Sequence, residues 1–300
     1  MYELIEAGAR TFYFDAPAKV GAYLLPDNGV LLIDSGSDKD AAKKILRICA
    51  EKGWTVSAIL ATHSHADHIG GNQVIQNKTG CPVYASEFEA AVGRFPILVP
   101  VSLYGGYPVR ELCTKFLLAK TSDVRPLPDP LPGGLTAIPL PGHSFDMVGF
   151  RTPDDVVFLG DSLTGEQLLK KHLVPFLYDV RTYLATLDEI ERLPAALYVP
   201  AHADAVSDVR PLVSLTRDKT MELLEELALV YVPASVEPCV SQLWRKSLKL
   251  FYVVGLGAHK SGVVGNKRLY KGIVILIFTL LVSSVDENPL YISVSLSARI

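Results

Sequence analysis

The chain has 300 residues, of which 49% are hydrophobic, so it can bury a sizeable core without disulfide staples. Its formal net charge of −3 disfavours nucleic acid as a partner and suits a small-molecule substrate. None of the four cysteines forms a C-x-x-C pair, so neither a cysteine zinc site nor a disulfide framework is expected. Residues 1–19 lack the basic start and apolar run of a secretory signal, so we expect a cytoplasmic protein. Assembly into a homo-oligomer is left as an open alternative to a monomer.

Strands and helices alternate in the first part of the chain. The apolar runs Ala22–Leu25 and Val30–Ile33 are separated by the turn sequence P-D-N-G, which predicts a hairpin. Residues 38–52 carry apolar side chains at helical spacing and are followed by Gly53, so a helix is expected there. Asp34 directly follows the second strand, where an Asx-turn alone would explain an aspartate.

Four metal-ligand side chains then occur within six positions of the stretch L-A-T-H-S-H-A-D-H-I-G-G: His63, His65, Asp67 and His68. Imidazole and carboxylate suit zinc and neighbouring metals, and a chance grouping of three of the seven histidines is disfavoured. The apolar run 56–61 predicts a strand before them, and I-G-G-N suits a helix start where the backbone passes close to another segment. The ligands are thus expected at the carboxyl end of a strand, where open α/β sheets bind ligands.

The alternation stops between Glu87 and Pro132. This stretch contains seven prolines, and its aromatic residues follow no clear period. A segment this long and irregular is usually functional or disordered, and its apolar content argues against disorder. We expect an inserted cap at about residues 87–134 that walls a substrate pocket, with a packing flap as the alternative.

Apolar runs at Leu135–Leu140 and Val156–Leu159 predict strands that end just before His143 and Asp161. The remaining elements are expected at residues 181–193 (helix), 197–199 (strand, before His202) and 211–229 (helix).

The last part of the chain is less informative. Residues 244–249 form a basic patch, either a solvated helix face or an anion site. Residues 272–285 are apolar over about fourteen positions, fewer than the roughly twenty needed to cross a bilayer. A buried strand or strand pair is therefore expected, without stable membrane insertion.

The motif T-H-S-H-A-D-H resembles the H-x-H-x-D-H signature of the metallo-β-lactamase superfamily. That pattern also needs a later His, an Asp and a final His, which occur here as His143 in L-P-G-H-S, Asp161 in F-L-G-D-S and His202 in V-P-A-H-A. The resemblance covers about residues 10–205 and implies an α/β (α+β) fold, the four-layer αββα sandwich. We expect this domain over residues 1–210 and a C-terminal helical or mixed extension with an apolar tail over residues 211–300.

The resemblance also implies a role for each ligand. One metal ion would be held by His63, His65 and His143, the second by Asp67, His68 and His202, and Asp161 would bridge them. Two zinc ions per chain are expected, with iron or manganese as alternatives. Asp34 would support the metal loop through hydrogen bonds.

The implied activity is that of a dinuclear metal-dependent hydrolase, in which a metal-bound hydroxide attacks the carbonyl of a thioester, lactone or ester. Asp67 and Asp161 would be the catalytic carboxylates, with Asp67 orienting the hydroxide or passing on its proton. A glyoxalase-II-like thioesterase is slightly preferred over a lactonase, because lactonases usually carry a tyrosine soon after the bridging Asp, and here none precedes Tyr178.

Other interpretations stay open. They are a mononuclear iron oxidoreductase similar to the persulfide dioxygenases, and a metal-bound binding protein without turnover. Glyoxalase-II-like enzymes carry a longer cysteine- and glycine-containing stretch after the bridging Asp, whereas S-L-T-G follows Asp161 here. Tyr178 and Tyr183 are candidates for the substrate pocket, although ordinary helix packing would explain both equally well.

Overall fold

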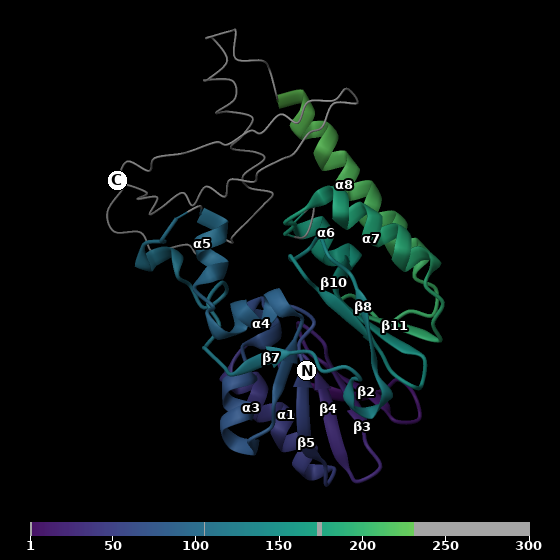
Figure 1. Ribbon diagram of the computed structural model, residues 1–300. Coiled ribbons are helices and arrows are strands. Elements are labelled where there is room, and N and C mark those ends of the chain that lie inside the picture. The colour runs from purple at the N-terminus through teal and green to yellow at the C-terminus, as the bar shows by residue number, and fades with distance from the viewer. Residues whose placement is uncertain (1, 105, 173–175, 231–300) are drawn as a thin grey trace, which may run out of the picture.

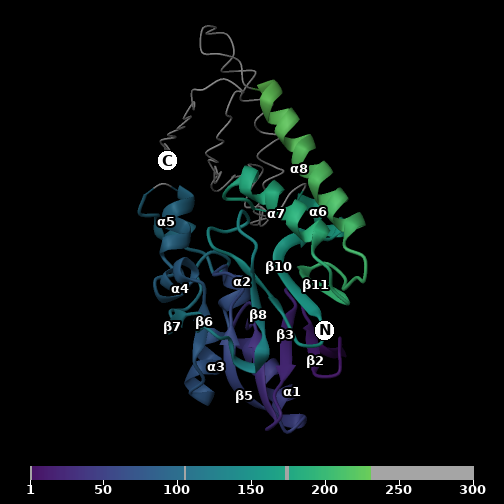
Figure 2. The same ribbon diagram turned by 45° about the vertical axis from the view of Figure 1, so that its right-hand side comes forward.

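The structure, a computed structural model, describes residues 2–104, 106–172 and 176–230. Within them, two β-sheets face each other and helices cover their outer faces (Figures 1 and 2). The first sheet consists of β1 (Glu3–Glu6), β2 (Thr11–Asp15), β3 (Val20–Leu24), β4 (Gly29–Ile33), β5 (Thr55–Leu60), β6 (Val83–Ala85) and β7 (Val124–Pro126). The second consists of β8 (Thr136–Pro139), β9 (Val148–Arg151), β10 (Val156–Thr164) and β11 (Leu197–His202).

The helices fall between and after these strands. They are α1 (Lys39–Glu51), α2 (Ala66–Ile69), α3 (Asn72–Thr79), α4 (Glu87–Arg94), α5 (Leu98–Tyr104), α6 (Glu166–His172), α7 (Val180–Arg192) and α8 (Arg210–Val230), with 3-10 helices at Arg110–Leu112 and Pro132–Gly134.

Three buried apolar layers explain the four-layer arrangement. Successive side chains of a strand point to opposite faces of its sheet, and β4 shows the result. Val30 and Leu32 pack in the core beneath α1, whereas Leu31 and Ile33 face the second sheet. A third cluster, which includes Leu187 of α7 and Val213 of α8, covers the other face of the second sheet. The expected αββα fold is confirmed.

Local sequence signals explain the first sheet. Strands β1 to β4 pair antiparallel, and the predicted hairpin β3–β4 is confirmed, with Asn28 in the left-handed region at φ +62°. Strands β4 to β7 are parallel and therefore need crossover connections, which α1 and α3 provide between β4 and β6. Helix α1 begins after Asp38, whose carboxylate accepts hydrogen bonds from the backbone N–H groups of Asp40 and Ala41.

The two ends of the expected insertion belong to the sandwich itself. Helix α4 packs on β6 and β7, with Ala90 and Val92 buried, and β7 pairs with β6 as the outermost strand of the first sheet. Between them, residues 95–104 and 106–118, which include α5, lie outside the two sheets (Figures 1 and 2). The insertion is therefore shorter than the expected residues 87–134, because a strand of three residues leaves no clear pattern in the sequence.

Strand β10 also departs from expectation. The sequence predicted a strand that ends at Leu159, just before Asp161, but β10 continues to Thr164 and contains Asp161. Gly160 adopts φ +52°, and the pairing of β10 with β11 shifts register on both sides of it. This bulge lets the strand continue through the site. Likewise, His202 is the last residue of β11 instead of following it.

The C-terminal boundary expected at residue 210 is too early. Helix α8 packs against α7 and β10, and Val213, Thr216 and Thr220 are buried. Its first half thus forms part of the outer layer of the sandwich. The predictions for residues 244–249 and 272–285 lie outside the described residues. Among the helices that are described, none is long and apolar enough to cross a membrane.

The glycine pair after the metal motif lies against the backbone that leaves β4. A Cβ atom on Gly70 would be 2.1 Å from the Ser37 carbonyl oxygen, and one on Gly71 would be 2.2 Å from the Ser35 carbonyl oxygen. The Ser35 N–H also donates to the His68 carbonyl oxygen at 2.8 Å. The close backbone approach predicted from I-G-G-N is confirmed, and it fixes the motif against β4.

Replacing Gly71 with alanine should destabilise the protein. Overpacking costs about 1–3 kcal/mol, and we expect the upper end of that range because the obstructing atom belongs to the backbone. The free energy of unfolding in urea measures this loss. Gly106→Ala is the matched control, since a Cβ there meets no atom within 4 Å. Equal stability of the two variants would contradict the close approach.

Candidate metal centre

Ligand-type side chains from both sheets meet at one edge of the sandwich. The first sheet contributes the loop after β5 and helix α2, and the second contributes the loop after β8 and strands β10 and β11. These segments bring together all seven predicted ligands: His63, His65, Asp67, His68, His143, Asp161 and His202. Their roles as ligands stay predictions, which the local geometry allows us to assess.

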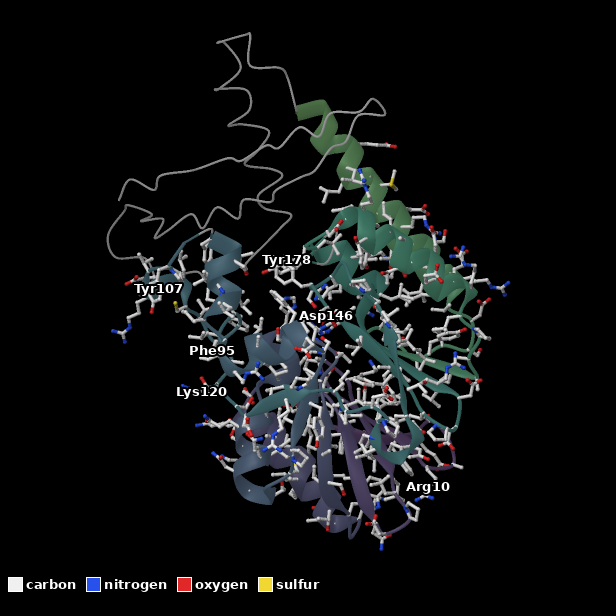
Figure 3. All side chains as sticks on the ribbon, in the orientation of Figure 1. Arg10, Phe95, Tyr107, Lys120, Asp146 and Tyr178 are labelled. Atoms are coloured by element: carbon white, nitrogen blue, oxygen red, sulfur yellow. The ribbon has the colours of Figure 1, made fainter. Side chains whose placement is uncertain are left out.

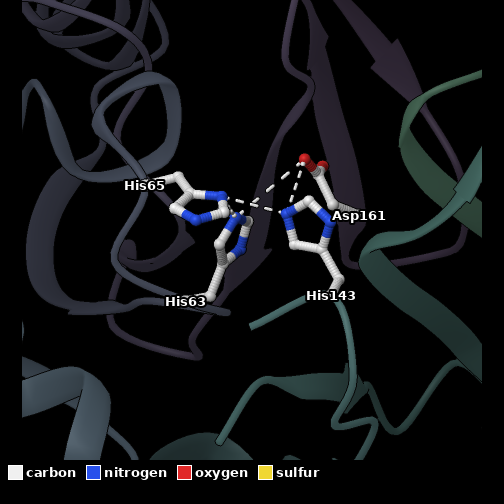
Figure 4. Close-up of side chains that lie close together, drawn as sticks. All are labelled: His63, His65, His143 and Asp161. Carbon is white, nitrogen blue, oxygen red and sulfur yellow. Dashed lines mark hydrogen bonds and ion pairs between the residues drawn. The ribbon is translucent and has the colours of Figure 1, made fainter. Parts of the chain in front are cut away.

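The first cluster consists of three imidazoles and a carboxylate (Figure 4). His65 Nδ1 lies 3.1 Å from His63 Nε2 and 2.9 Å from His143 Nε2. Asp161 Oδ2 lies 3.9 Å from His63 Nε2 and 3.4 Å from His143 Nε2. The three ring nitrogens and one carboxylate oxygen therefore face a common small volume.

The second cluster lies on the other side of Asp161. Its Oδ1 atom is 3.1 Å from His68 Nε2 and 3.4 Å from His202 Nε2. Asp67 Oδ2 lies 3.2 Å from His202 Nε2 and 3.7 Å from His68 Nε2. Each oxygen of Asp161 thus faces a different cluster, as a bridging carboxylate requires.

The distances fit a metal ion. Donor atoms about 2.0 Å from a tetrahedral zinc ion are about 3.3 Å apart, and the four separations given for the first cluster lie between 2.9 and 3.9 Å. His68 Nε2 and Asp161 Oδ1 are buried and make no hydrogen bond, although they lie 3.1 Å apart. Buried polar atoms without partners are costly, and a shared cation would satisfy both.

Hydrogen bonds behind the clusters fix the orientation of two imidazoles. The Thr62 hydroxyl lies 2.9 Å from Asp34 Oδ2 and donates its only hydrogen there, so it must accept the hydrogen of His63 Nδ1 at 3.1 Å. His68 Nδ1 donates to Asp34 Oδ2 at 2.8 Å. In their neutral forms both rings therefore present the Nε2 lone pair to the site.

His202 follows the same plan from the second sheet. Its Nδ1 lies 2.8 Å from the carbonyl oxygen of Pro17, which can only accept a hydrogen bond. The neutral ring consequently carries its hydrogen on Nδ1 and directs the Nε2 lone pair towards Asp67 and Asp161.

Electrostatics differ between the clusters. Burial lowers the pKa of His63 well below its ordinary value and that of His143 to about 3, so these rings stay neutral and able to bind a cation. In the second cluster burial also opposes protonation, but Asp161 and its neighbouring carboxylates raise the pKa of His68 well above its ordinary value and that of His202 to about 10. The second cluster therefore attracts positive charge, which a proton or a metal ion can supply.

Asp34 lies where the resemblance implied. It adopts φ +67°, and its carboxylate accepts from the Thr62 N–H at 2.7 Å, from the Thr62 hydroxyl and from His68. It therefore supports the metal loop from β4. The Asx-turn alternative is not needed to explain this residue.

Sequence reasoning missed Glu89, a buried carboxylate that joins the two ligand loops. Only 2% of this residue is exposed. One of its oxygens accepts from the N–H of Ser64 at 2.9 Å and its hydroxyl at 2.5 Å, and the other from the Ser144 hydroxyl at 2.6 Å and the Asp146 N–H at 3.2 Å. Ser64 lies between two candidate ligands and Ser144 follows a third. An acidic residue early in a helix is usually solvated, so no local pattern distinguishes it.

The two tyrosines have different positions. Tyr183 is fully buried, and its hydroxyl donates to the Ser162 carbonyl oxygen at 2.8 Å. It therefore supports β10 beside Asp161, which is the packing role left open for it. Tyr178 is only half-buried and points towards α5, where its hydroxyl hydrogen-bonds to Ser102 (Figure 3).

A family model of the metallo-beta-lactamase superfamily matches residues 18–202. A hydroxyacylglutathione hydrolase of Rhodopseudomonas palustris is 34% identical over an alignment of 149 residues that covers 46% of this chain and 49% of that protein. A probable metallo-hydrolase of Bacillus subtilis, YqgX, is 33% identical over 149 residues, 49% of this chain and 67% of that protein. The chain thus spans about half the length of the hydroxyacylglutathione hydrolases that it matches.

Solved structures show the same fold. A beta-lactamase domain protein from Burkholderia ambifaria superposes with a TM-score of 0.60 at 17% identity, covering 82% of this chain and 85% of that one. A metallo-beta-lactamase family protein from Thermus thermophilus also gives 0.60, at 22% identity, covering 82% and 89%. At these identities the likeness concerns the fold alone.

The Glu89→Gln variant should be less stable than the unchanged protein. In the variant, the amide nitrogen replaces one carboxylate oxygen, so an NH2 group faces two of the hydrogen-bond donors that bind Glu89. Leaving those buried donors without an acceptor should cost about 3 kcal/mol. Urea unfolding of the metal-free protein measures this cost. Metal affinity should also fall, by about 10–100-fold as for other groups that position ligands.

Glu87→Gln is the matched control, because Glu87 lies in the same helix and is exposed. We expect its unfolding free energy to stay within about 0.5 kcal/mol of the unchanged protein. If both variants behaved alike, Glu89 would not hold the ligand loops together.

Proposed function

The chain belongs to the metallo-beta-lactamase superfamily, and from this premise we propose that it is a hydrolase with two metal ions that acts on carbonyl substrates. The observation that carries the proposal is the position of Asp161, whose two oxygens face two separate clusters of ring nitrogens. Relatives named as hydrolases, matched over 49% and 67% of their length, support the reaction class.

The donor set favours zinc, with iron or manganese as alternatives. One ion would be held by His63, His65 and His143, the other by Asp67, His68 and His202, and Asp161 would contribute one oxygen to each. Imidazole nitrogens with a few carboxylate oxygens match the ligand preference of zinc. When bound, such ions acidify a coordinated water and neutralise the charge that develops on a carbonyl oxygen.

The carboxylates have distinct tasks in this proposal. Asp161 is buried, and its two oxygens would serve one imidazole cluster each. Asp67 has 43% of its side chain exposed while it contacts His202. It can therefore reach both the centre and a molecule arriving from solvent, and it would orient the attacking water or receive its proton.

The hydrogen bonds of Tyr178 and Tyr183 favour a thioester or ester as the substrate. A lactone carbonyl that is polarised by a tyrosine would need a free hydroxyl hydrogen. Tyr183 donates its hydrogen to the Ser162 carbonyl oxygen. The Ser102 hydroxyl donates its own hydrogen to the Val99 carbonyl oxygen at 2.9 Å, so Tyr178 must be the donor in the bond between them. Neither hydrogen is then free for a substrate carbonyl. The similarity to hydroxyacylglutathione hydrolases favours the thioester.

Purified without added metal, the protein should contain two metal ions per chain, mainly zinc. The Asp161→Ala variant should lose at least one of them, because two cations without a shared carboxylate repel each other. Turnover should fall by at least about 100-fold, as when a preorganised electrostatic group is removed. Elemental analysis and steady-state kinetics measure both effects.

Asp218→Ala provides the control, since Asp218 is an exposed aspartate on α8. It should retain metal and activity. A variant at Asp161 that kept both metals and full activity would exclude the bridge. One iron ion per chain and no zinc would instead favour the oxidoreductase interpretation.

A substrate panel at neutral pH should give turnover among carbonyl compounds. We expect thioesters to react best, simple esters less well and lactones least, because neither Tyr178 nor Tyr183 has a hydroxyl hydrogen free for the lactone carbonyl. β-Lactams and phosphodiesters complete the panel. Hydrolysis of phosphodiesters with inert carbonyl compounds would contradict the proposed class.

A further inference from the structure

A row of aromatic rings leads away from the candidate centre. Phe176 lies edge-on to His65, with ring centroids 5.5 Å apart, and Tyr178 lies 5.1 Å from Phe176. Phe145 follows at 3.9 Å from Tyr178, and Phe88 at 4.5 Å from Phe145. We call these four side chains, Phe88, Phe145, Phe176 and Tyr178, the aromatic row.

The outer end of the aromatic row is open to solvent. Phe145 is 47% exposed and Phe88 is 45% exposed. Single exposed apolar side chains are common on proteins, whereas a contiguous exposed apolar patch marks a binding surface. This patch is continuous with the candidate centre, because the ring of Phe176 also lies 6.4 Å from that of His143.

Neighbouring hydrogen bonds hold the row in place. The hydroxyl of Tyr178 is bound to Ser102 of α5. The residues on either side of Phe145 both donate hydrogen bonds to the buried carboxylate of Glu89. A surface that is already ordered loses little conformational entropy when a ligand binds.

The row offers apolar contacts. Because the hydrogen of Tyr178 is donated to Ser102, the ring faces and edges are what this tyrosine presents to a ligand. Another aromatic ring matches such a surface through offset stacking or edge-to-face contacts.

We propose that the aromatic row binds an aromatic ring of the substrate, attached within a few bonds of the reacting carbonyl. This inference rests on the proposed hydrolase function. The short linker follows from the position of Phe176, whose ring centroid is 5.5 Å from that of a candidate metal ligand, His65.

Binding to the zinc-loaded 300-residue chain tests the row without turnover. Phenylacetate and acetate are the probes, compared by calorimetry. Phenylacetate should bind more tightly, and Phe145→Ala should weaken it by about three- to tenfold, as expected for one aromatic contact. Acetate binding should not change.

Two further variants make the comparison specific. Phe145→Leu keeps an apolar side chain and should recover part of the lost affinity, also if the alanine variant folds poorly. Phe95→Ala removes an exposed ring that lies below α5 and away from Tyr178 (Figure 3). It should leave phenylacetate binding unchanged.

Three thioesters identify the side of the substrate that carries the ring: S-ethyl thioacetate, S-ethyl phenylthioacetate and S-benzyl thioacetate. One of the two aromatic compounds should have a higher kcat/KM than the first, mainly through a lower KM, and Phe145→Ala should remove that advantage.

The outcomes separate this inference from the proposed function. Equal affinity for phenylacetate and acetate, or a loss that Phe95→Ala shares, would overturn the aromatic row. Turnover of all three thioesters at equal kcat/KM would do the same while leaving the hydrolase intact. Selective phenylacetate binding that depends on Phe145, without hydrolysis of any thioester, would support the row and count against the hydrolase.

Discussion

The candidate centre depends on where three imidazoles carry their single hydrogen. His63, His68 and His202 each place Nδ1 against an oxygen of the protein, so in the neutral rings the Nε2 lone pairs point inward. A neutral ring without such a partner could carry its hydrogen on either nitrogen. The tautomer with the hydrogen on Nε2 would present an N–H group to the site in place of a lone pair. Asp34 orients two of the three, because it accepts from His68 directly and holds the Thr62 hydroxyl that accepts from His63.

The lone pairs are useful only if two sheets bring them together, and buried contacts between the sheets ensure this. Gly160 shows how close the approach is: a Cβ there would be 3.1 Å from the side chain of Thr62. Glu89 adds a polar connection, since it binds the loops of both sheets through four hydrogen bonds. A buried carboxylate with this many donors is stable where it lies and strongly opposes separation of the loops.

The sequence predicted the parts of the site that are local. The histidines of the motif follow an apolar run directly, so their position after β5 could be read from the pattern, as could the glycine pair that passes close to β4. Non-local contacts left no pattern. The bulge at Gly160 places Asp161 inside a strand, β7 returns to the sheet with three residues, and Glu89 differs from a solvated helix residue only through partners more than twenty positions away. The sequence could not decide between packing and a pocket position for Tyr183 for the same reason, because its burial depends on the packing of α7.

The centre and the aromatic row together restrict what can bind between them. The centre concentrates carboxylates and imidazoles, so it favours cations. Once bound cations balance the charge of the carboxylates, the centre favours polar groups such as a carbonyl. The aromatic row begins with Phe176, beside His65, and ends at the half-exposed ring of Phe88. A molecule that satisfies both must be polar at one end and apolar at the other, within the span of a few rings. A ligand that is charged along its whole length would satisfy only the first, since it would have to lose its hydration against the rings without a compensating partner.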